Sequence, residues 1–449
     1  MKELNLTQGS VPKVLLQFAV PFLIANVLQA LYGGADLFVV GQYDDSASVA
    51  AVAIGSQVMQ TITGIILGIT TGTTVLIAIA TGAKDDKKVA FTIGSSVWLF
   101  SIIGVLLTLV MVFFHGRIAE LMHTPIEAMA DTKSYILVCS AGILFIVGYN
   151  VVCGILRGLG DSKTPLYFVA LACVINIVLD YVFIFIFGWE MMGAALATSL
   201  GYVVGAAMII IYLSRKKNVI HFCRVKLSRK SMQLTWRNVK YMCRLGASTF
   251  LCEGAIACMM FAGNYVFISY LGEDGVAAFS IACYFFPIIF MVYNAIGQSA
   301  QPILSYNFGA GDEARVRSAF RLALATAVIC GLVFFALTAI FNHQIVAMFI
   351  DRSYPAYDIA VSGLPLFASG FVFFAVNIVS IGYFQSVERA RPAMVVTVLR
   401  GFVFMVICLL GLPLLFKVPG IWLAVPLAEV LTFLVITIIY WRKHQSVRG

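Results

Sequence analysis

The sequence predicts an all-α membrane protein whose twelve transmembrane helices form two lobes of six. Three observations support this prediction. First, of the 449 residues, 61% are hydrophobic and only 11% are charged, and the mean hydropathy is +0.97, whereas soluble domains carry roughly 25% charged residues. Second, apolar runs of about 20 residues, long enough to cross a bilayer, recur along the chain. Third, the second half of the chain repeats the pattern of the first.

Each apolar run extends to the next polar break in the chain. The runs begin near residues 13, 49, 89, 127, 164, 192, 240, 275, 314, 354, 391 and 420. The first run is long and contains polar residues such as Asn26, Gln29 and Asp36, which is not typical of a cleavable signal peptide. We therefore expect it to remain as the first span.

The basic residues predict how the chain is oriented. If the N-terminus lies inside, the inner segments hold 25 of the 30 Lys and Arg residues and the outer loops hold four. The positive-inside rule then places both termini in the cytoplasm of a multi-pass protein of the cell (inner) membrane. The net charge of +9 is thereby explained by topology. We expect contact with the lipid bilayer and no nucleic-acid partner.

Cysteines and histidines do not form a recognisable reactive site. The ten cysteines are scattered, most of them within spans, without a CxxC motif or a Cys/His ligand spacing. We interpret them as small apolar packing residues. No metalloprotease, nucleophile-elbow, Walker or dinucleotide-binding glycine motif occurs. The sequence therefore disfavours an enzyme and a pump driven by its own ATPase, and we expect no cofactor beyond a coupling ion.

An internal repeat relates the two halves. The segment LTQGSVPKVLLQFAVPF, from Leu6, aligns with LTWRNVKYMCRLGASTF, from Leu234, at an offset of 228 residues. The later segments TGAKDDKKVA and FGAGDEARVR align at an offset of 227. Because six is even, both halves enter the membrane from the same side. We therefore expect parallel repeats related by a pseudo-two-fold axis near the membrane normal, with a central cleft between them.

The repeat and the basic linker define the predicted domains. Residues 1–215 form the N-terminal six-helix lobe and residues 240–449 the C-terminal six-helix lobe. Residues 216–239 form a basic cytoplasmic linker, part of which fits an amphipathic helix lying on the inner membrane surface.

Acidic and amide side chains distinguish the N-terminal lobe. Asn176 and Asp180 lie four residues apart in the fifth span, so their side chains share one helical face. An ionised Asp inside a membrane helix costs about 2.5–3.5 kcal/mol. It is retained where it faces protein or water, carries a proton or binds a cation. The alternative is a structural Asp that ties helices together. The repeat counterparts of these two residues are Val403 and Ile407.

The predicted cation site combines four residues of this lobe. Asp36, Asn176, Asp180 and Thr198 would supply two carboxylates, an amide and a hydroxyl. Such oxygen ligands suit Na⁺, and a buried carboxylate also suits a proton, so the sequence leaves the coupling ion open. Tyr135 and Asn150, in the fourth span, are candidates for further contacts; ordinary interhelical hydrogen bonding is the alternative.

Three other features of the spans are candidates for function. Pro21 frees a backbone carbonyl and predicts a bend in the first span, unless it only fits the packing. Glu253, in the seventh span, would neutralise a cationic substrate. The alternative for Glu253 is an ion pair with Arg400 or a hydrogen bond that packs helices. We interpret Arg400 and Glu429 as structural or gating residues.

The segments PFLIANVLQALYGGADLFVVG, ILRGLGDSKTP, NIVLDYVFIFIFG and GAALATSLG, and the inner-loop pair GAKDD and GAGDE, resemble the multidrug and toxic compound extrusion (MATE) family. The resemblance covers nearly the whole chain. It implies an N-lobe cation site with Tyr135 as a neighbouring contact and Pro21 as the bending point of the first helix; the site residues are Asp36, Asn150, Asn176, Asp180 and Thr198. Glu253 matches an acid of one branch of the family. The tenth span, from Gly363 to Phe384, lacks the carboxylate that would partner it, which favours coupling in the N-lobe.

The resemblance also implies a function. It implies a secondary active transporter, which we expect to be monomeric, that exports organic, often cationic, drugs or toxic compounds and contributes to antibiotic resistance. Export would be exchanged for H⁺ or Na⁺ by alternating access, with the cation and the drug favouring different conformations. The alternative is a flippase for lipids or lipid-linked saccharides. That activity would need a strongly cationic cavity for a pyrophosphate headgroup, and Arg400 is the single basic residue within a span.

Overall fold

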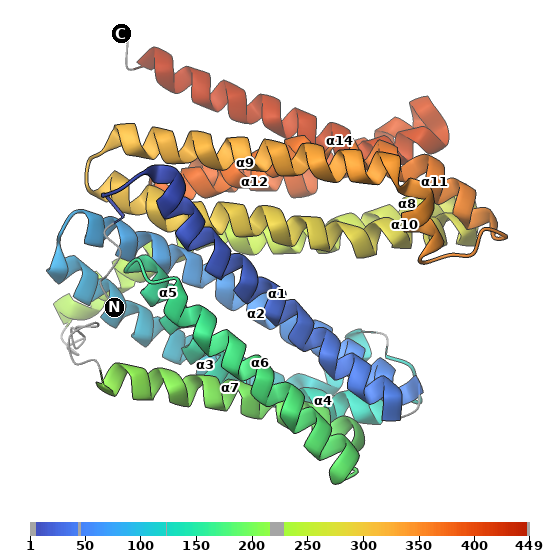
Figure 1. Ribbon diagram of the computed structural model, residues 1–449, viewed down its shortest axis with the longest axis horizontal. Coiled ribbons are helices and arrows are strands. Elements are labelled where there is room, and N and C mark those ends of the chain that lie inside the picture. Colours follow the sequence, from blue (N-terminus) through green and yellow to red (C-terminus); the bar gives the residue numbers. More distant parts are fainter. Residues whose placement is uncertain (1–5, 44–45, 123, 216–228, 447–449) are drawn as a thin grey trace. The chain divides into compact units, whose positions relative to one another are not determined.

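The computed structural model describes residues 6–43, 46–122, 124–215 and 229–446, and for residues 30–38, 41–43, 46–47, 213–215 and 442–446 it describes the backbone alone. The described part is helical and contains no β-strand, which confirms the predicted class. The elements are α1 (Val11–Tyr43), α2 (Ser46–Gly82), α3 (Asp86–Leu121), α4 (Met129–Ala141), α5 (Ile143–Gly158), α6 (Lys163–Tyr181), η1 (Val182–Ile186), α7 (Glu190–Arg215), α8 (Arg229–Gly309), α9 (Glu313–Ile340), α10 (Asn342–Ala347), α11 (Pro355–Ala368), α12 (Phe371–Ser386), α13 (Ala390–Val398), η2 (Leu399–Phe404) and α14 (Met405–Ser446) (Figure 1).

The helices account for the predicted spans. In the described part, eight helices are long and apolar enough to cross a bilayer, and the bent pairs α4–α5 and α11–α12 raise that number to ten. Two of the long helical segments each join two helices across a residue with non-helical backbone, Gly272 in α8 and Lys417 in α14. The segments Arg229–Gly309 and Ala390–Trp441 therefore each contain two spans, and the described helices agree with the predicted twelve.

The sequence repeat is also a repeat of local structure. Asp85 and Asp312 begin α3 and α9 in the same way, because each carboxylate accepts a hydrogen bond from the backbone N–H three residues later, at 3.0 and 2.9 Å. Glu190 and Lys417, which are repeat counterparts, both adopt positive φ, 47° and 52°. The pair α4–α5 is bent by 50° and its counterpart α11–α12 by 45°. The offset of 227 residues therefore relates equivalent turns, caps and bends.

The contacts divide the chain into two compact units. The N-terminal unit comprises Met1–Gln8 and Leu16–Gly246, and the C-terminal unit comprises Gly9–Leu15 and Ala247–Gly449. Residues 216–228 of the predicted linker lie outside the described residues, and residues 229–239 belong to α8. The domain boundaries drawn from the sequence stay a prediction.

Each unit includes the first turns of a helix that continues into the other unit. In the C-terminal unit the guanidinium of Arg315 donates a hydrogen bond to the backbone carbonyl of Gly9, just before α1, at 2.8 Å. In the N-terminal unit the start of α8 packs directly on α2. A Cβ atom on Gly72 would lie 2.0 Å from the carbonyl oxygen of Met242, so only glycine permits this approach.

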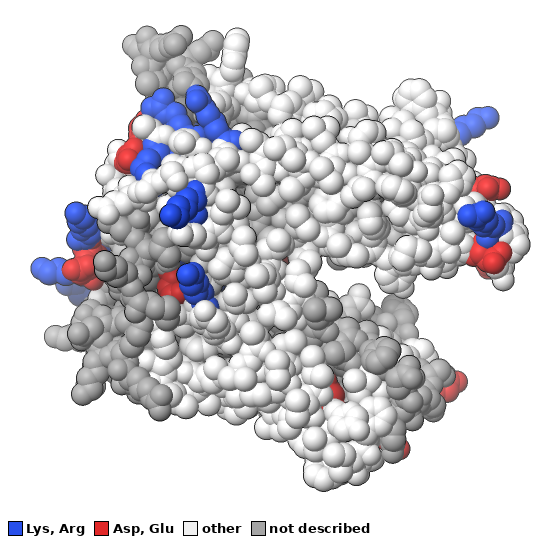
Figure 2. Space-filling model, in the orientation of Figure 1, with Lys and Arg blue, Asp and Glu red and all other residues white. Residues whose placement is uncertain are grey.

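The surface has the charge pattern of a membrane-spanning protein. Lys and Arg side chains gather at the ends of the units where α3 and α9 begin, and most of the visible helical surface carries no charge (Figure 2). Of the 18 consecutive residues that identify α3 as a span, only 22% are buried, and the same share applies to α9. These two helices therefore present apolar side chains outward, as lipid-facing helices do.

Candidate functional site

Helix α6 carries the two residues at the centre of the predicted cation site. Its start is fixed by Asp161, whose Oδ1 accepts hydrogen bonds from the backbone N–H groups of Lys163 at 3.1 Å and Thr164 at 3.0 Å. The apolar run then continues the helix until it passes into the π-helical turn η1. Asn176 and Asp180 lie in the last two turns of α6, and the side chains of both are 0% exposed.

Helix α7 lies antiparallel to α6 and brings Thr198 to the same level. A Cβ atom on Gly201 would lie 3.6 Å from the Cβ of Asn176, and one on Gly193 would lie 3.2 Å from the Cγ1 of Ile184. In this register the buried Thr198 lies at about the same height along the helices as Asp180. Three of the predicted site residues therefore lie at similar heights on two neighbouring helices.

The two residues predicted from the fourth span have separate contacts. The Nδ2 of Asn150, on α5, donates to the backbone carbonyl of Ile146 in its own helix at 2.9 Å. The ring of Tyr135, on α4, packs on Gly55 of α2, and its hydroxyl lies 3.1 Å from the Oγ of Ser56. Both side chains are buried. Tyr135 therefore connects α4 to α2.

The amide of Asn176 has an unusual environment. Neither its Oδ1 nor its Nδ2 makes a hydrogen bond within the described part of the chain. A buried polar group left in this state costs about 1–3 kcal/mol, so its presence needs an explanation. The amide oxygen of Asn176, the Asp180 carboxylate and the Thr198 hydroxyl are oxygen groups of the kind that suits Na⁺. A proton on Asp180 would neutralise the buried charge equally well. The residues present fit either ion.

The predicted contributions of α1 are described only in part. The helix is continuous through Pro21. The next residue, Phe22, lies under the guanidinium of Arg157, whose carbon is 5.3 Å from the ring centroid. The side chain of Asp36 lies outside the described residues. The roles of Asp36 in the site and of Pro21 in bending stay predictions.

In the C-terminal unit, Glu253 lines a pocket. The pocket encloses about 400 Å³ of empty space, its open mouth included. Its wall comes from both spans of α8 and from α12. The polar residues that line it are Thr249, Glu253, Asn294, Gln298, Gln301 and Gln385.

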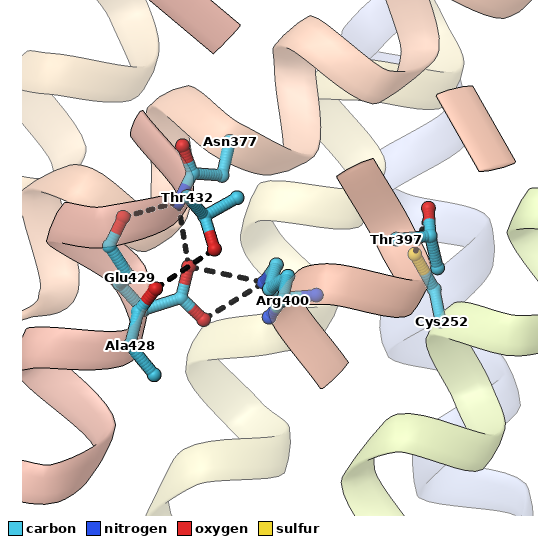
Figure 3. A network of polar contacts seen from close by, with 7 residues as sticks. All are labelled: Cys252, Asn377, Thr397, Arg400, Ala428, Glu429 and Thr432. Atoms are coloured by element: carbon cyan, nitrogen blue, oxygen red, sulfur yellow. Dashed lines mark hydrogen bonds and ion pairs between the residues drawn. The ribbon is translucent and has the colours of Figure 1, made fainter. Parts of the chain in front are cut away.

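Arg400 and Glu429 form an ion pair inside the C-terminal unit (Figure 3). The Nε of Arg400 lies 2.8 Å from Oε1 and 3.0 Å from Oε2 of Glu429, and the side chains are 5% and 1% exposed. Asn377, on α12, donates its Nδ2 to Glu429 Oε2 at 2.7 Å. The guanidinium carbon lies 4.5 Å from the ring centroid of Phe374. Buried charges persist where they are paired in this way.

This ion pair decides between the two interpretations of Glu253. An ion pair between Glu253 and Arg400 was one of the alternatives, and it is wrong, because Arg400 is engaged by Glu429. Within the described residues the Glu253 carboxylate makes no hydrogen bond and no ion pair. Its charge therefore remains available at the pocket wall.

Three residues that complete the buried ion pair and the Glu253 pocket were not predicted from the sequence: Asn377, Gln301 and Gln385. Asn377 is the repeat counterpart of Asn150, a signal that the alignment of the halves already contained. Arg400 and Glu429 are charges of opposite sign, each without a charged counterpart in the first half, which is a second signal that they belong together. Gln301 and Gln385 carried no signal of their own, since single amides are frequent in spans.

The chain is similar to known transporters in sequence and in structure. The family model described as MatE matches residues 21–182 and 253–410. Multidrug export protein MepA of Staphylococcus saprophyticus is 24% identical, over 92% of this chain and 89% of that protein. Probable multidrug resistance protein YoeA of Bacillus subtilis is 25% identical, over 98% and 96%. A crystal structure of MATE in the bent conformation has a TM-score of 0.90 and 25% identity, covering 100% of this chain and 98% of that one.

Proposed function

The chain belongs to the MatE family of multidrug transporters, and from this premise we propose that it exports organic cations in exchange for H⁺ or Na⁺ by alternating access. The observation that carries the proposal is the buried pair Asn176 and Asp180, in which a carboxylate lies one turn from an amide without hydrogen bonds inside the described part. A coupling cation would be bound by the Asp180 carboxylate and by the Oδ1 of Asn176, which accepts no hydrogen bond within the described part. We propose that it binds there, with Thr198, Asn150 and Asp36 as further contacts.

The exchange follows from competition between two ligands. A cation that binds the N-terminal unit more tightly in one conformation shifts the population toward that conformation, and a drug that prefers another shifts it back. Each ligand then weakens the other by the same factor. Bending of α1 at Pro21 is the conformational change that we assign to this coupling. We expect the transporter to work as a monomer.

The charge distribution weighs against the alternative, a flippase for lipid-linked saccharides. A pyrophosphate headgroup would need an excess of positive charge within the spans. The guanidinium of Arg400 is neutralised by Glu429, and the carboxylate of Glu253 keeps the pocket of the C-terminal unit acidic. These residues favour a cationic substrate over an anionic headgroup.

The proposed orientation, in the cell membrane with both termini in the cytoplasm, leads to a labelling prediction. We expect a cysteine placed at the exposed Asp274 to react with a membrane-impermeant maleimide in intact cells, because it follows the break at Gly272 between two spans. A cysteine at Lys87 should react only after the cells are opened, because it lies in the first turn of α3, in a basic stretch assigned to the inner side. The ten native cysteines are replaced beforehand. Labelling of position 87 in intact cells would contradict this orientation.

Export itself is tested in a bacterial host that lacks its own drug pumps. Cells expressing the protein are expected to accumulate less of a fluorescent organic cation than cells carrying an empty vector. Removing Na⁺ and collapsing the proton gradient separately should identify the coupling ion, because loss of the driving gradient restores accumulation. If export continues after both gradients are removed, ion exchange is not the driving mechanism.

A further inference from the structure

The pocket of the C-terminal unit has a polar composition that the coupling mechanism does not use. The residues contributed by the second span of α8, from Phe290 to Gln301, recur every three or four positions and so lie along one helical face. The eleven residue steps from Phe290 to Gln301 correspond to about 16 Å of helix. Glu253 faces this groove from the first span of α8, and Gln385 from α12.

The side-chain hydrogen bonds fix which atoms of the amides remain available. Gln301 donates its Nε2 to the Oε1 of Gln385 at 2.8 Å. Gln385 in turn donates its Nε2 to Ser248 Oγ and to Thr249 Oγ1, both at 2.8 Å. The amide oxygen of Gln301 is left as an acceptor, since within the described residues nothing donates to it. The amide oxygen of Gln298 is also left as an acceptor, because the Nε2 of Gln298 donates to Asn294 Oδ1 at 3.1 Å.

The pocket therefore offers acceptors and a negative charge. Its acceptors are the amide oxygens of Gln298 and Gln301 and the carboxylate of Glu253, and the one aromatic side chain on its wall is Phe290. A quaternary ammonium group has no N–H to donate and is bound best in a cage of several aromatic rings. A cation with N–H groups would instead form charge-assisted hydrogen bonds to these oxygens.

We propose that this pocket is a substrate subsite that selects organic cations bearing N–H donors, such as protonated primary or secondary amines and amidinium groups, over quaternary cations. The proposal deepens the proposed export function and rests on it. Binding sites built from hydrogen-bonding groups discriminate strongly against a ligand that lacks the matching group, because their polar atoms are then left unpaired.

The two amides at the inner end of this pocket, Gln301 and Gln385, are not repeated in the first half of the sequence. The counterparts of Gln301 and Gln385 are Thr74 and Gly158. A Cβ atom on Gly158 would lie 2.9 Å from the carbonyl oxygen of Thr74, so the two helices are in direct contact there. At the same positions of the C-terminal unit, the amide side chains of Gln301 and Gln385 supply polar atoms instead.

The test uses two cations of the same skeleton, naphthylethylammonium and naphthylethyltrimethylammonium, titrated against the purified full chain by their fluorescence. We expect the N–H-bearing cation to bind about tenfold more tightly to the wild type, the equivalent of one charge-assisted hydrogen bond. Gln298→Leu is expected to reduce this ratio to about threefold or less. Glu253→Gln is expected to weaken binding of both cations and also to lower the ratio.

Matched controls come from exposed residues of the same unit. Gln344→Leu removes an exposed amide from α10 and Glu273→Gln an exposed carboxylate near the break in α8, and neither should change the ratio. If Gln298→Leu lowers the thermal midpoint, Gln298→Met provides a variant of closer shape. Equal binding of the two cations, or a ratio unchanged by both Glu253→Gln and Gln298→Leu, overturns the subsite. Gradient-driven export of both cations would then leave the proposed function intact, whereas export of neither would refute that function as well.

Discussion

Asp180→Asn is expected to abolish ion-driven export while the protein still reaches the membrane and binds drug. The substitution keeps the size of a side chain that is 0% exposed but removes the charge that a proton or Na⁺ would neutralise. In coupled systems one ligand changes the affinity for the other by about 5–150-fold. We expect the shift in drug affinity between ion-free and ion-saturated buffer to disappear in the variant. Binding titrations on the purified protein measure that shift directly.

A control variant and a second site variant separate coupling from structure. Asp131→Asn alters a half-buried carboxylate in the first turn of α4 and should leave the ion effect unchanged. Asn176→Leu removes an amide that makes no hydrogen bond within the described part of the chain. It should therefore abolish the ion effect without loss of stability, since the unsatisfied amide itself costs about 1–3 kcal/mol. An Asp180→Asn protein that retains the ion effect and exports at the wild-type rate would exclude coupling at this site.

Glu429→Leu is expected to destabilise the C-terminal unit by about 3–5 kcal/mol, because it leaves the buried Arg400 without a partner. The double variant Arg400→Met with Glu429→Leu should recover most of that loss, since two apolar side chains of similar size need no pairing. Thermal unfolding in detergent, followed by tryptophan fluorescence, measures both effects. Arg317 and Glu313, an exposed ion pair of α9 at 3.1 Å, provide the matched control. Breaking that pair should change the stability by less than about 1 kcal/mol.

The same set of variants distinguishes a structural ion pair from a gating one. A structural pair predicts that the double variant regains both stability and export. If the double variant is as stable as the wild type but no longer exports, the pair takes part in the transport cycle. If the double variant regains neither stability nor export, mutual neutralisation is not the main role of these two charges.

The two units differ in whether a residue of the chain neutralises their buried carboxylate, and this difference suggests a separate role for each unit. In the N-terminal unit the carboxylate of Asp180 lies one turn from an amide that makes no hydrogen bond within the described part, an arrangement that an exchangeable ion would complete. In the C-terminal unit the guanidinium of Arg400 already neutralises Glu429. That internal cation is part of the chain and cannot leave. This difference supports the proposal that ions exchange with the solution at the N-terminal unit and that Glu253 binds the cationic substrate.

Much of the fold was predictable from the sequence because its signals are local. A span is recognised by about 20 consecutive apolar residues, and orientation by the position of Lys and Arg in short loops. Asn176 and Asp180 share a face because four residues make about one helical turn. The repeat offset also predicted matching caps, as Asp85 and Asp312 show.

The tertiary structure alone decided which polar side chains meet. Arg400 and Glu429 are 29 residues apart, and Asn377 is 52 residues from Glu429. Their meeting depends on how three helices are rotated about their own axes and shifted along one another. That rotation and shift are set by side-chain packing along whole helices, such as the contact of Gly201 with Asn176, and hydrophobic periodicity does not encode them. For this reason the sequence identified Glu253 and Arg400 as charges within spans but left their pairing open. The packing left Glu253 unpaired at a pocket and placed Arg400 against Glu429.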